Sequence, residues 1–424
     1  MIRHLFKGII RDRSRSFLPI IVVSIGVSLT VLLSGYIRGA FDDIIDQNAK
    51  FDTGHVKIMS KSYRENKDLL PNDLALLGVN HLMDSLQQVF PDMIWTERIR
   101  FGGLIDAPDT EGLSKGQGPA SGLGINLLNR ESGEAERMNI ESSLVTGSIP
   151  TKPGGVILAH AFSEKLGVKV GDQVTFFGTT MNNSMTFQNF TVSGTIRFGT
   201  AAMDRGSVII DISDAQMMLD MQDGAGEILG FFNDNAYVQE KAQYVTDQFN
   251  ASYKSNSDEF APVMLTLRDQ NGLAQMLDYS QAMSSIFVFL FVMAMSVVLW
   301  NTGLLGGLRR YKEFGIRLAL GEGKGHIYRS LLMESVLIGV IGSIIGTSIG
   351  LLATYLLQVY GIDISDALEN STMLMPSVIR AKITPELFFI GFIPGVLATV
   401  VGSMLSGIGI YKRSTASLFK ELEV

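Results

Sequence analysis

The stretch AMSSIFVFLFVMAMSVVLWNTGLL, residues Ala282–Leu305, contains no charged residue. An uncharged stretch of about 18 or more residues is long enough to cross the hydrocarbon core of a bilayer as a helix. Phe17–Ile37 and Leu387–Ile410 also have no charge, and Ser330–Val359 has only Glu334. The sequence therefore predicts four transmembrane helices, at residues 17–40, 282–305, 330–359 and 387–410.

The first apolar stretch follows several basic residues, which is also typical of a cleaved secretory signal peptide. Its apolar run is longer than the usual h-region of about 7–15 residues, and no small-residue cleavage site of the A-x-A type follows it. We therefore favour a retained membrane helix at this position.

Basic residues indicate the orientation of the chain. They gather in the N-terminal tail, in the stretch Arg309–Arg329 and in the C-terminal tail, whereas Tyr360–Glu386 is mostly acidic. Short loops rich in Lys and Arg stay in the cytoplasm. We therefore expect cytoplasmic termini, with residues 306–329 forming a cytoplasmic loop and residues 41–281 and 360–386 lying on the outer side of the membrane.

Residues 1–16 alternate apolar and basic side chains at helical spacing, which predicts an amphipathic helix at the inner membrane surface. A disordered basic tail would not explain that spacing. Residues 411–424 are expected to form a short cytoplasmic tail, and membrane lipids are expected partners of the chain.

Residues 41–281 are predicted to form an α+β domain. Strand-helix-strand patterns occur at both of its ends, at 55–60, 72–90 and 94–105 and again at 228–233, 236–253 and 262–267. We predict a split βαβ module with an inserted β-rich subdomain at residues 110–226, and the glycine-rich tract Gly112–Gly122 is expected to be a loose loop. The whole chain is thus predicted to be an α-helical membrane protein with a large α+β extracytoplasmic domain.

The chain offers little that could catalyse a reaction. It has five His residues, none at metal-ligand spacing, and no Cys, so we expect no metal site. The segment around Gly323 and Lys324 resembles a phosphate loop, but Leu318 stands where the first Gly belongs and Gly325 replaces the Ser or Thr that would hold magnesium. We expect no cofactor on this chain, no enzyme activity of its own and no nucleic-acid partner.

The stretch RRYKEFGIRLALGEGKGHIYRSLLMES, Arg309–Ser335, separates the second and third apolar stretches. Tyr311, Phe314 and Leu318 can share one face of a short helix surrounded by basic residues, which indicates a docking element. A simple positive-inside anchor is the alternative. Glu334 lies near the membrane and needs a partner, for which Arg317 and Arg329 are candidates; a structural ion pair with Arg329 and a role in coupling both stay open.

The same stretch resembles the signature of the FtsX-like permeases. The matching residues are Arg310, Glu313, Gly315, Arg317, Leu320, Gly321, Arg329 and Glu334. The stretches GGVILAHAFSEKLGVKVGDQVTFF and FTVSGTIRFGTAAMDRGSVIIDISDAQMML, together with the N-terminal stretch, are similar to the lipoprotein-releasing LolC/LolE branch and to MacB. The resemblance covers nearly the whole chain.

The resemblance implies a permease of a type VII ABC transporter, which works as a homodimer or heterodimer with ATPase subunits that hold ATP and Mg. It also implies that the chain lies in the bacterial inner membrane and that its large outer domain is periplasmic. It implies that the basic stretch docks on the ATPase, and the residues assigned to this coupling are Arg310, Glu313, Phe314, Arg317, Leu318, Leu320 and Gly321. Closure of the ATPases would move the coupling helices, and stiff membrane helices would pass this motion to the periplasmic domain.

The expected function is the extraction of lipoproteins from the inner membrane for delivery toward the outer membrane. A lipoprotein would enter between the first two membrane helices, where the candidate acyl contacts are Ile25, Leu29, Leu32, Phe287, Leu290 and Phe291. A periplasmic carrier is a possible further partner, but the hairpin Phe176–Phe190 is expected to be a plain one rather than a carrier-binding hook.

Three alternatives to lipoprotein release remain. The first is a MacB-like exporter of peptides or small molecules. The second is an FtsX-like mechanotransmitter that controls a periplasmic partner. The third is a membrane-anchored enzyme, for which the sequence contains no catalytic constellation.

Overall fold

A computed structural model describes residues 13–109, 111–198, 201–253, 258–363 and 378–412, although some side chains within these ranges, among them those of residues 302–315, are not described. The described residues form two compact units that divide between residues 43 and 44 and between residues 274 and 275. We call them the helical unit and the sheet unit. The corresponding limits of the outer domain predicted from the sequence are residues 41 and 281.

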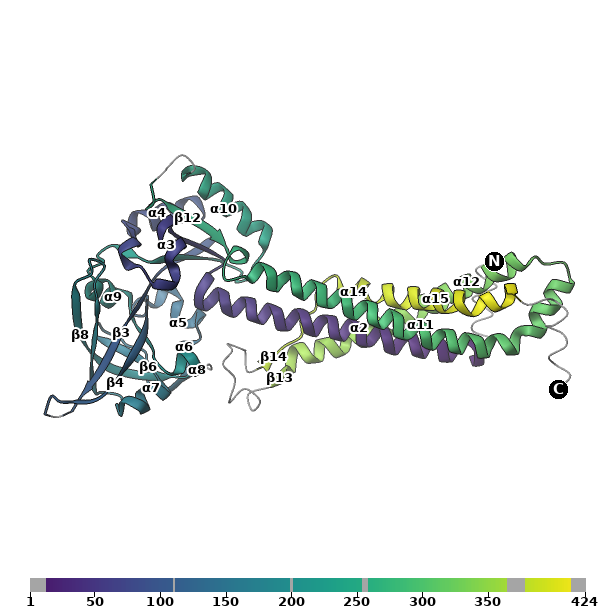
Figure 1. Cartoon of the computed structure of the whole chain (residues 1–424), viewed down its shortest axis with the longest axis horizontal. Helices are drawn as coiled ribbons and strands as arrows, with labels where there is room; N and C mark the ends of the chain where they lie inside the picture. The colour runs from purple at the N-terminus through teal and green to yellow at the C-terminus, as the bar shows by residue number, and fades with distance from the viewer. Residues whose placement is uncertain (1–12, 110, 199–200, 254–257, 364–377, 413–424) are drawn as a thin grey trace. The chain divides into compact units, whose positions relative to one another are not determined.

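The helical unit consists of long helices that run side by side (Figure 1). Its helices are α2 (Arg13–Asn48), α11 (Leu273–Ala319), α12 (Lys324–Tyr360), α14 (Leu387–Ile390) and α15 (Phe392–Lys412), and the short strands β13 (Ile362–Asp363) and β14 (Val378–Ile379) pair with each other. Among the described residues, three helical segments are long and apolar enough to cross a membrane, namely Phe17–Thr53, Lys324–Tyr360 and Leu387–Gly407. The apolar part of α11 described by side chains, Ser285–Asn301, is shorter. The predicted second span lies within this helix, and the count of four spans stays a prediction.

Small residues allow the helices of this unit to pack closely. A side chain added at Gly342, Gly346 or Gly350 of α12 would collide with Val23, Val27 or Val31 of α2. A Cβ at Gly395 of α15 would lie 2.1 Å from Ser343 Oγ. Close backbone approach through small residues is how membrane helices associate without a hydrophobic driving force. Helices α2, α12 and α15 therefore share one glycine-lined contact region.

The sheet unit contains a 10-stranded sheet whose strand order is β12-β1-β11-β3-β4-β9-β6-β8-β5, with β7 paired to β3 and β8. Its strands are β1 (Val56–Ser60), β3 (Met93–Pro108), β4 (Ser114–Ile125), β5 (Leu144–Gly147), β6 (Gly155–Ala159), β7 (Gln173–Thr179), β8 (Met185–Ile196), β9 (Ser207–Asp211), β11 (Glu227–Phe232) and β12 (Pro262–Thr266). The α-helices are α3 (Lys61–Asn66), α4 (Val79–Val89), α5 (Glu134–Arg137), α6 (Ile140–Ser143), α7 (His160–Leu166), α8 (Ala201–Asp204), α9 (Ile212–Leu219) and α10 (Gln239–Tyr253).

Strand β3 joins the two parts of this sheet. Its first half pairs with β11, from Met93 to Arg98, and its second half pairs with β4, from Ile99 to Pro108. On the β11 side, the units β1-α4-β3 and β11-α10-β12 form four antiparallel strands, and α4 and α10 share a hydrophobic core with them. On the β4 side, α7 and α9 cover a second core. One long strand thus connects both cores.

The tract Gly112–Gly122 differs from the sequence expectation, because most of it belongs to strand β4 rather than to a loose loop. Strand β4 pairs with β3 and also with β9. A Cβ at Gly122 would lie 2.0 Å from the ring of Phe101, and one at Gly118 would lie 2.7 Å from the ring of Phe162. The glycines are therefore needed to seat aromatic rings of the core.

The stretch Asn72–Phe90 was predicted as one helix, and it is divided instead. Residues Asn72–Leu74 form a 3-10 turn, and β2 (Leu76–Leu77) pairs with β10 (Gly224–Ala225). Gly78 follows with a φ of 68°, and α4 begins only after it. A glycine in the left-handed region at this point lets the chain turn from strand to helix, which the apolar spacing alone did not reveal.

Candidate functional site

The predicted coupling stretch forms the end of one helix, a tight turn and the start of the next helix. Residues 309–319 belong to α11, and α12 begins at Lys324. The separate short helix expected from the sequence is therefore the last part of a 47-residue helix. Arg310, Glu313 and Phe314 lie in this helix, but their side chains are outside the described part of the structure.

The turn has the hydrogen bonds of a Schellman motif, which ends a helix by satisfying its last carbonyl groups. Gly321 N–H donates to Leu318 O at 3.1 Å, and Glu322 N–H donates to Arg317 O at 3.0 Å. Gly321 has a φ of 90°, in the region that favours glycine. The conformation of the turn thus explains why a glycine follows Leu320 in the sequence signature.

Charged and apolar side chains stabilise the two sides of this turn. Glu322 lies 3.9 Å from Arg317 Nε and 3.6 Å from His326 Nε2. Leu318 packs against the buried Ile327. Leu320 is 83% exposed, and Ile316 is also exposed. Part of the Leu318 side chain is thus buried within the turn. Ile316, which was not predicted as a coupling residue, instead exposes apolar surface to which a partner could bind.

The candidate acyl contacts differ in exposure. Ile25, Leu29 and Leu290 are exposed. Leu32 and Phe287 are half-buried, and Phe291 packs against the apolar cluster formed by α2, α11, α14 and α15. The exposed members could contact lipid or an acyl chain, and their assignment to substrate stays a prediction.

The residues of the predicted ion pair lie near the start of α12, where Glu334 is half-buried and Arg329 is exposed. Their pairing stays a prediction.

The segment before α14 is attached along α2, a feature that the sequence did not indicate. Lys382 N–H donates to Gly35 O at 3.0 Å, and a Cβ at Gly39 would lie 1.9 Å from Arg380 O. Ion pairs join Arg38 to Glu386 and Lys382 to Asp42. This attachment is made within the helical unit and holds α2 to the chain that leads into α15.

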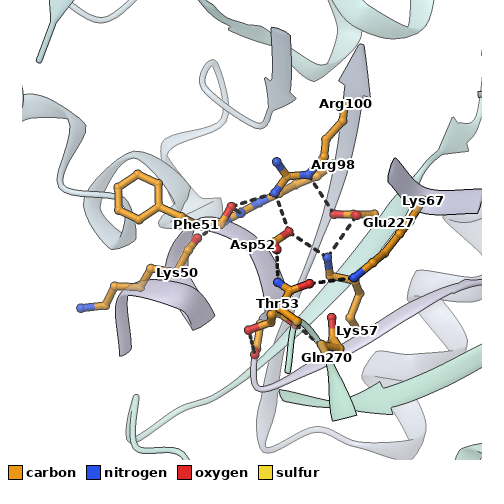
Figure 2. A network of polar contacts seen from close by, with 12 residues as sticks. Lys50, Phe51, Asp52, Thr53, Lys57, Lys67, Arg98, Arg100, Glu227 and Gln270 are labelled. Carbon is orange, nitrogen blue, oxygen red and sulfur yellow. Dashed lines mark hydrogen bonds and ion pairs between the residues drawn. The ribbon is translucent and has the colours of Figure 1, made fainter. Parts of the chain in front are cut away.

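A buried ion cluster lies in the sheet unit where the chain leaves α2. After α2, residues Ala49–Thr53 form a short π-helix. Two arginines of β3 bind its carbonyl groups (Figure 2). Arg98 donates to Lys50 O at 2.7 Å and to Phe51 O at 3.0 Å, and Arg100 donates to Phe51 O at 3.0 Å. Cations at the C-terminal end of a helix satisfy its free carbonyls and its negative dipole end.

Carboxylates balance these cations. Arg98 is fully buried and pairs with Glu134 at 2.9 Å, and Arg137 pairs with the same carboxylate. Lys57 lies 3.1 Å from both Asp52 and Glu227. We call the set of Asp52, Lys57, Arg98, Arg100, Glu134 and Glu227 the ion cluster. Such buried charges persist only when they are paired.

The sequence contained only a weak signal for this cluster. Strand β3 places Arg98 and Arg100 among apolar residues, and a basic residue within an apolar strand pattern needs a buried partner. The partners are Glu134 for Arg98 and Asp52 and Glu227 for Arg100. They come from other parts of the chain, so spacing could not identify them. Among the residues that the structure describes, no group of three or more His, Asp or Glu side chains could hold a metal ion.

Two family profiles match the chain. The family described as MacB-like periplasmic core domain matches residues 16–252, which is more than half of the chain. The family described as FtsX-like permease C-terminal matches residues 285–415. The coupling turn lies within the second match, and the ion cluster lies largely within the first.

Curated relatives come from two groups of transporters. The lipoprotein-releasing system transmembrane protein LolC of Xylella fastidiosa is 24% identical over 227 residues, which are 52% of this chain and 53% of that protein. The macrolide export ATP-binding/permease protein MacB of Neisseria meningitidis is 31% identical over 109 residues, which are 26% of this chain and 15% of that protein. The chain thus spans about half the length of the LolC relative that it matches.

A solved structure, the periplasmic region of MacB from Actinobacillus actinomycetemcomitans, matches with a TM-score of 0.36 and 12% identity, over 55% of this chain and 98% of that chain. No conclusion about the fold follows at this score. The two family profiles together cover both units, the helices with the coupling turn and the sheet unit. The chain therefore belongs to the ABC transporter permeases of the FtsX/MacB/LolC family.

Proposed function

We propose that this chain is the permease subunit of an ATP-driven transporter of the inner membrane, and that a separate ATPase subunit, with ATP and Mg, drives it through the turn at Leu320–Gly323. The observation that carries the proposal is the continuity of α11, which runs as one helix from Leu273 to Ala319. An unbroken hydrogen-bonded helix is stiff along its axis, so a push at its last residue displaces its first residue.

The proposed substrate is a lipoprotein, which the transporter would extract from the bilayer. The LolC relatives support this substrate, since their name describes lipoprotein release. Exposed apolar residues of α2 and α11, such as Ile25, Leu29 and Leu290, could receive acyl chains as they leave the lipid. The need for ATP follows from the cost of withdrawal, about 0.8 kcal/mol for each buried CH₂ group.

The proposed complex contains two permease protomers, which could be identical or different, and two ATPases. Both termini would be cytoplasmic and the sheet unit periplasmic. A soluble carrier would dock on a surface formed by both protomers rather than on the β7–β8 hairpin. In support, the hairpin tip is hydrogen-bonded to the end of α9, because Met181 N–H donates to Leu219 O at 2.8 Å and Asn182 donates to Asp220 at 3.0 Å.

A MacB-like exporter of peptides or small molecules is the second candidate. The match of residues 16–252 to the MacB-like periplasmic core domain and the MacB relatives favour it. An FtsX-like mechanotransmitter is supported only by the C-terminal profile, which is shared across the family.

Reconstitution distinguishes these functions. The purified chain is incorporated into proteoliposomes with its partner ATPase and a fluorescent triacylated lipoprotein, and release to a soluble carrier is measured with and without ATP. The same vesicles are loaded with a macrolide as the alternative cargo. We expect ATP-dependent release of the lipoprotein and no ATP hydrolysis by the chain alone. Export of the macrolide without lipoprotein release would favour the second candidate.

Deletion of Met181–Ser184 tests the role of the hairpin in the same assay. We expect carrier-dependent release to persist, because this tip is bound to the sheet unit itself. Complete loss of carrier binding, with the unit still folded, would identify the hairpin as the carrier site.

A further inference from the structure

We propose that the ion cluster is a joint that locks the residues directly after α2 to the residues directly before α11, so that the two helices act on the sheet unit as a pair. The role of this joint in transport rests on the proposed function. The joint itself follows from contacts within the sheet unit and can be tested without transport.

The first half of the joint is the end of α2. The π-helix Ala49–Thr53 closes with a hydrogen bond from Gly54 N–H to Ala49 O at 2.9 Å. Arg98 and Arg100 hold the carbonyl groups of Lys50 and Phe51. Because both arginines belong to β3, the strand that connects the two cores of the sheet unit, a displacement of these carbonyls must displace the central strand as well.

The second half of the joint is the segment before α11. Gln270 donates to Thr53 O at 3.3 Å and to Thr266 O at 3.0 Å, and its side chain is buried. Asn271 donates to Asp52 and accepts from Lys67 Nζ at 2.7 Å. Helix α11 begins two residues later, at Leu273.

Asp52 connects the two halves through its carboxylate, in addition to the hydrogen bond from Gln270 to Thr53 O. One of its oxygens accepts from Arg100 at 2.8 Å and from Lys57 at 3.1 Å (Figure 2). The other oxygen accepts from Asn271. A cluster that served only to hold the sheet together would need Arg100, Lys57 and Glu227, which all belong to strands. It would not need Asn271, which lies 219 residues away from Asp52 and has no place in the sheet.

The backbone at Asn271 supports the same interpretation. Its φ is 53°, and Gly272 follows with a φ of 69°. Two consecutive residues in the left-handed region are unfavourable for most side chains, although Asn and Gly tolerate it. This conformation positions the amide of Asn271 beside Asp52 at the point where α11 starts.

Hydrogen exchange of the full chain in nanodiscs, without ATPase, tests the joint directly. In the Asp52→Asn variant, we expect exchange of the backbone amides of residues 266–275 to accelerate about tenfold, because the start of α11 loses its anchor to the end of α2. The matched control is Asp46→Asn, which removes the ion pair between Asp46 of α2 and the side chain of Lys50 in the π-helix but touches no member of the ion cluster. Exchange in the control should stay within twofold of the unmodified chain. Equal exchange at residues 266–275 in both variants would overturn the proposal.

If Asp52→Asn fails to fold, Asn271→Gly provides the same test, because glycine tolerates the φ of 53° at this position and removes only the side chain of Asn271. Its side chain is exposed and uncharged, so its removal leaves Asp52 paired with Arg100 and Lys57. We again expect about tenfold faster exchange at residues 266–275. Unchanged exchange in this variant would contradict the joint.

A transport experiment tests what the joint does. The chain has no cysteine, so Asp52→Cys with Asn271→Cys creates a unique thiol pair. In the proteoliposome assay, we expect the double variant to release lipoprotein about tenfold more slowly at an unchanged rate of ATP hydrolysis. A short bifunctional thiosulfonate should restore release to within threefold, and reduction should abolish the restoration.

Crosslinking that leaves release at the level of the double variant would show that the joint has no part in coupling. If the unmodified complex releases no lipoprotein at all, the proposed function fails instead, and the exchange experiment still decides whether the joint exists.

Discussion

The two ends of α11 are built in opposite ways. At the C-terminal end, a Schellman turn leaves Leu320 83% exposed and pairs its charges at the surface. Before the N-terminal end, Gln270 is 5% exposed, and its neighbour Asn271 contacts the ion cluster. One end is open to a partner, and the other end is fixed to its own domain.

We infer from this difference that the two ends of α11 have different roles. An open end with exposed apolar residues can gain contacts when an ATPase docks, because removing apolar surface from water stabilises protein–protein association. A fixed end with buried ion pairs resists local rearrangement, because each separated charge would be left unpaired. The comparison therefore predicts that mutations at the two ends fail in different assays.

The largest effect is expected for Arg98→Ala, which would break the fixed end. The change leaves Glu134 with one partner fewer and frees the carbonyls of Lys50 and Phe51. Breaking a buried ion pair costs about 3–5 kcal/mol. Urea unfolding of the full chain in detergent, followed by tryptophan fluorescence, measures the loss. The exposed Arg130→Ala is the control and should change the free energy of unfolding by less than about 0.5 kcal/mol. A loss below about 1 kcal/mol for Arg98→Ala would contradict a fixed end.

The second-largest effect is expected at low pH, which should lower the free energy of unfolding through a residue beside the fixed end. His55 lies beside the joint, and its carbonyl accepts from Leu267 N–H at 3.0 Å. Burial lowers the pKa of His55 to about 4, from an ordinary value of 6.5. Between these values the unfolded chain binds the proton and the folded chain does not, so the free energy of unfolding rises with pH across this window. At about 1.4 kcal/mol per pKa unit, the difference amounts to about 3 kcal/mol.

The variant His55→Asn tests this pH dependence. Asparagine keeps an acceptor for Phe232 N–H, to which His55 Nδ1 is now bound at 3.0 Å, and does not titrate. Unfolding measured from pH 4 to pH 7 should show a flatter profile in this variant, whereas the exposed His81→Asn should retain the slope of the unmodified chain. Equal slopes in all three proteins would refute the assignment to His55.

Mutations at the open C-terminal end of α11 are expected to reduce ATPase binding rather than the stability of the chain. Replacing Ile316 and Leu320 by Asp sets charges on the exposed apolar surface and should reduce ATPase binding by about 2 kcal/mol or more, roughly 30-fold in affinity. The thermal unfolding midpoint should hardly change. Phe314→Asp, at the predicted coupling position, is compared in the same pull-down. Leu318→Asp serves as the contrast, because Leu318 packs on Ile327 and its replacement should also lower stability. Normal ATPase binding by the double variant would place docking elsewhere.

The smallest effect is expected for Gly321→Ala. Alanine at a φ of 90° should cost about 1 kcal/mol at the turn. The matched Gly325→Ala lies inside α12 and should be neutral or slightly stabilising, since alanine is the better helix former. Thermal unfolding of the two variants, side by side, measures the difference. If both behave alike, the left-handed position is not required.

The sequence predicted elements best where a single periodicity or composition held over many residues. The apolar stretches at 17–40, 330–359 and 387–410 overlap with helical segments long enough to cross a membrane. The FtsX-like signature around Gly321 was interpreted as a family resemblance, and the family profiles confirm it. Length and apolar composition are properties of the chain itself, so no tertiary contact was needed to detect them.

Prediction failed where distant residues changed a local preference. Gly112–Gly122 has the composition of a loop, yet most of it is a strand, because the rings of Phe101 and Phe162 need the space above its glycines. The basic stretch was interpreted as a loop with a short helix, but α11 continues through residues 306–319 to the glycine turn. In both places the local composition was compatible with more than one structure.

The sequence by itself determined that the chain contains apolar stretches long enough to form membrane-spanning helices, and that it belongs among permeases of this type. These properties depend on residues close together in the chain. Only the tertiary structure showed that Asp52, Arg100 and Asn271 meet, or that the chain before α14 lies along α2. Hydrogen bonds and ion pairs between segments more than 200 residues apart have no spacing rule, so only folding brings such partners together.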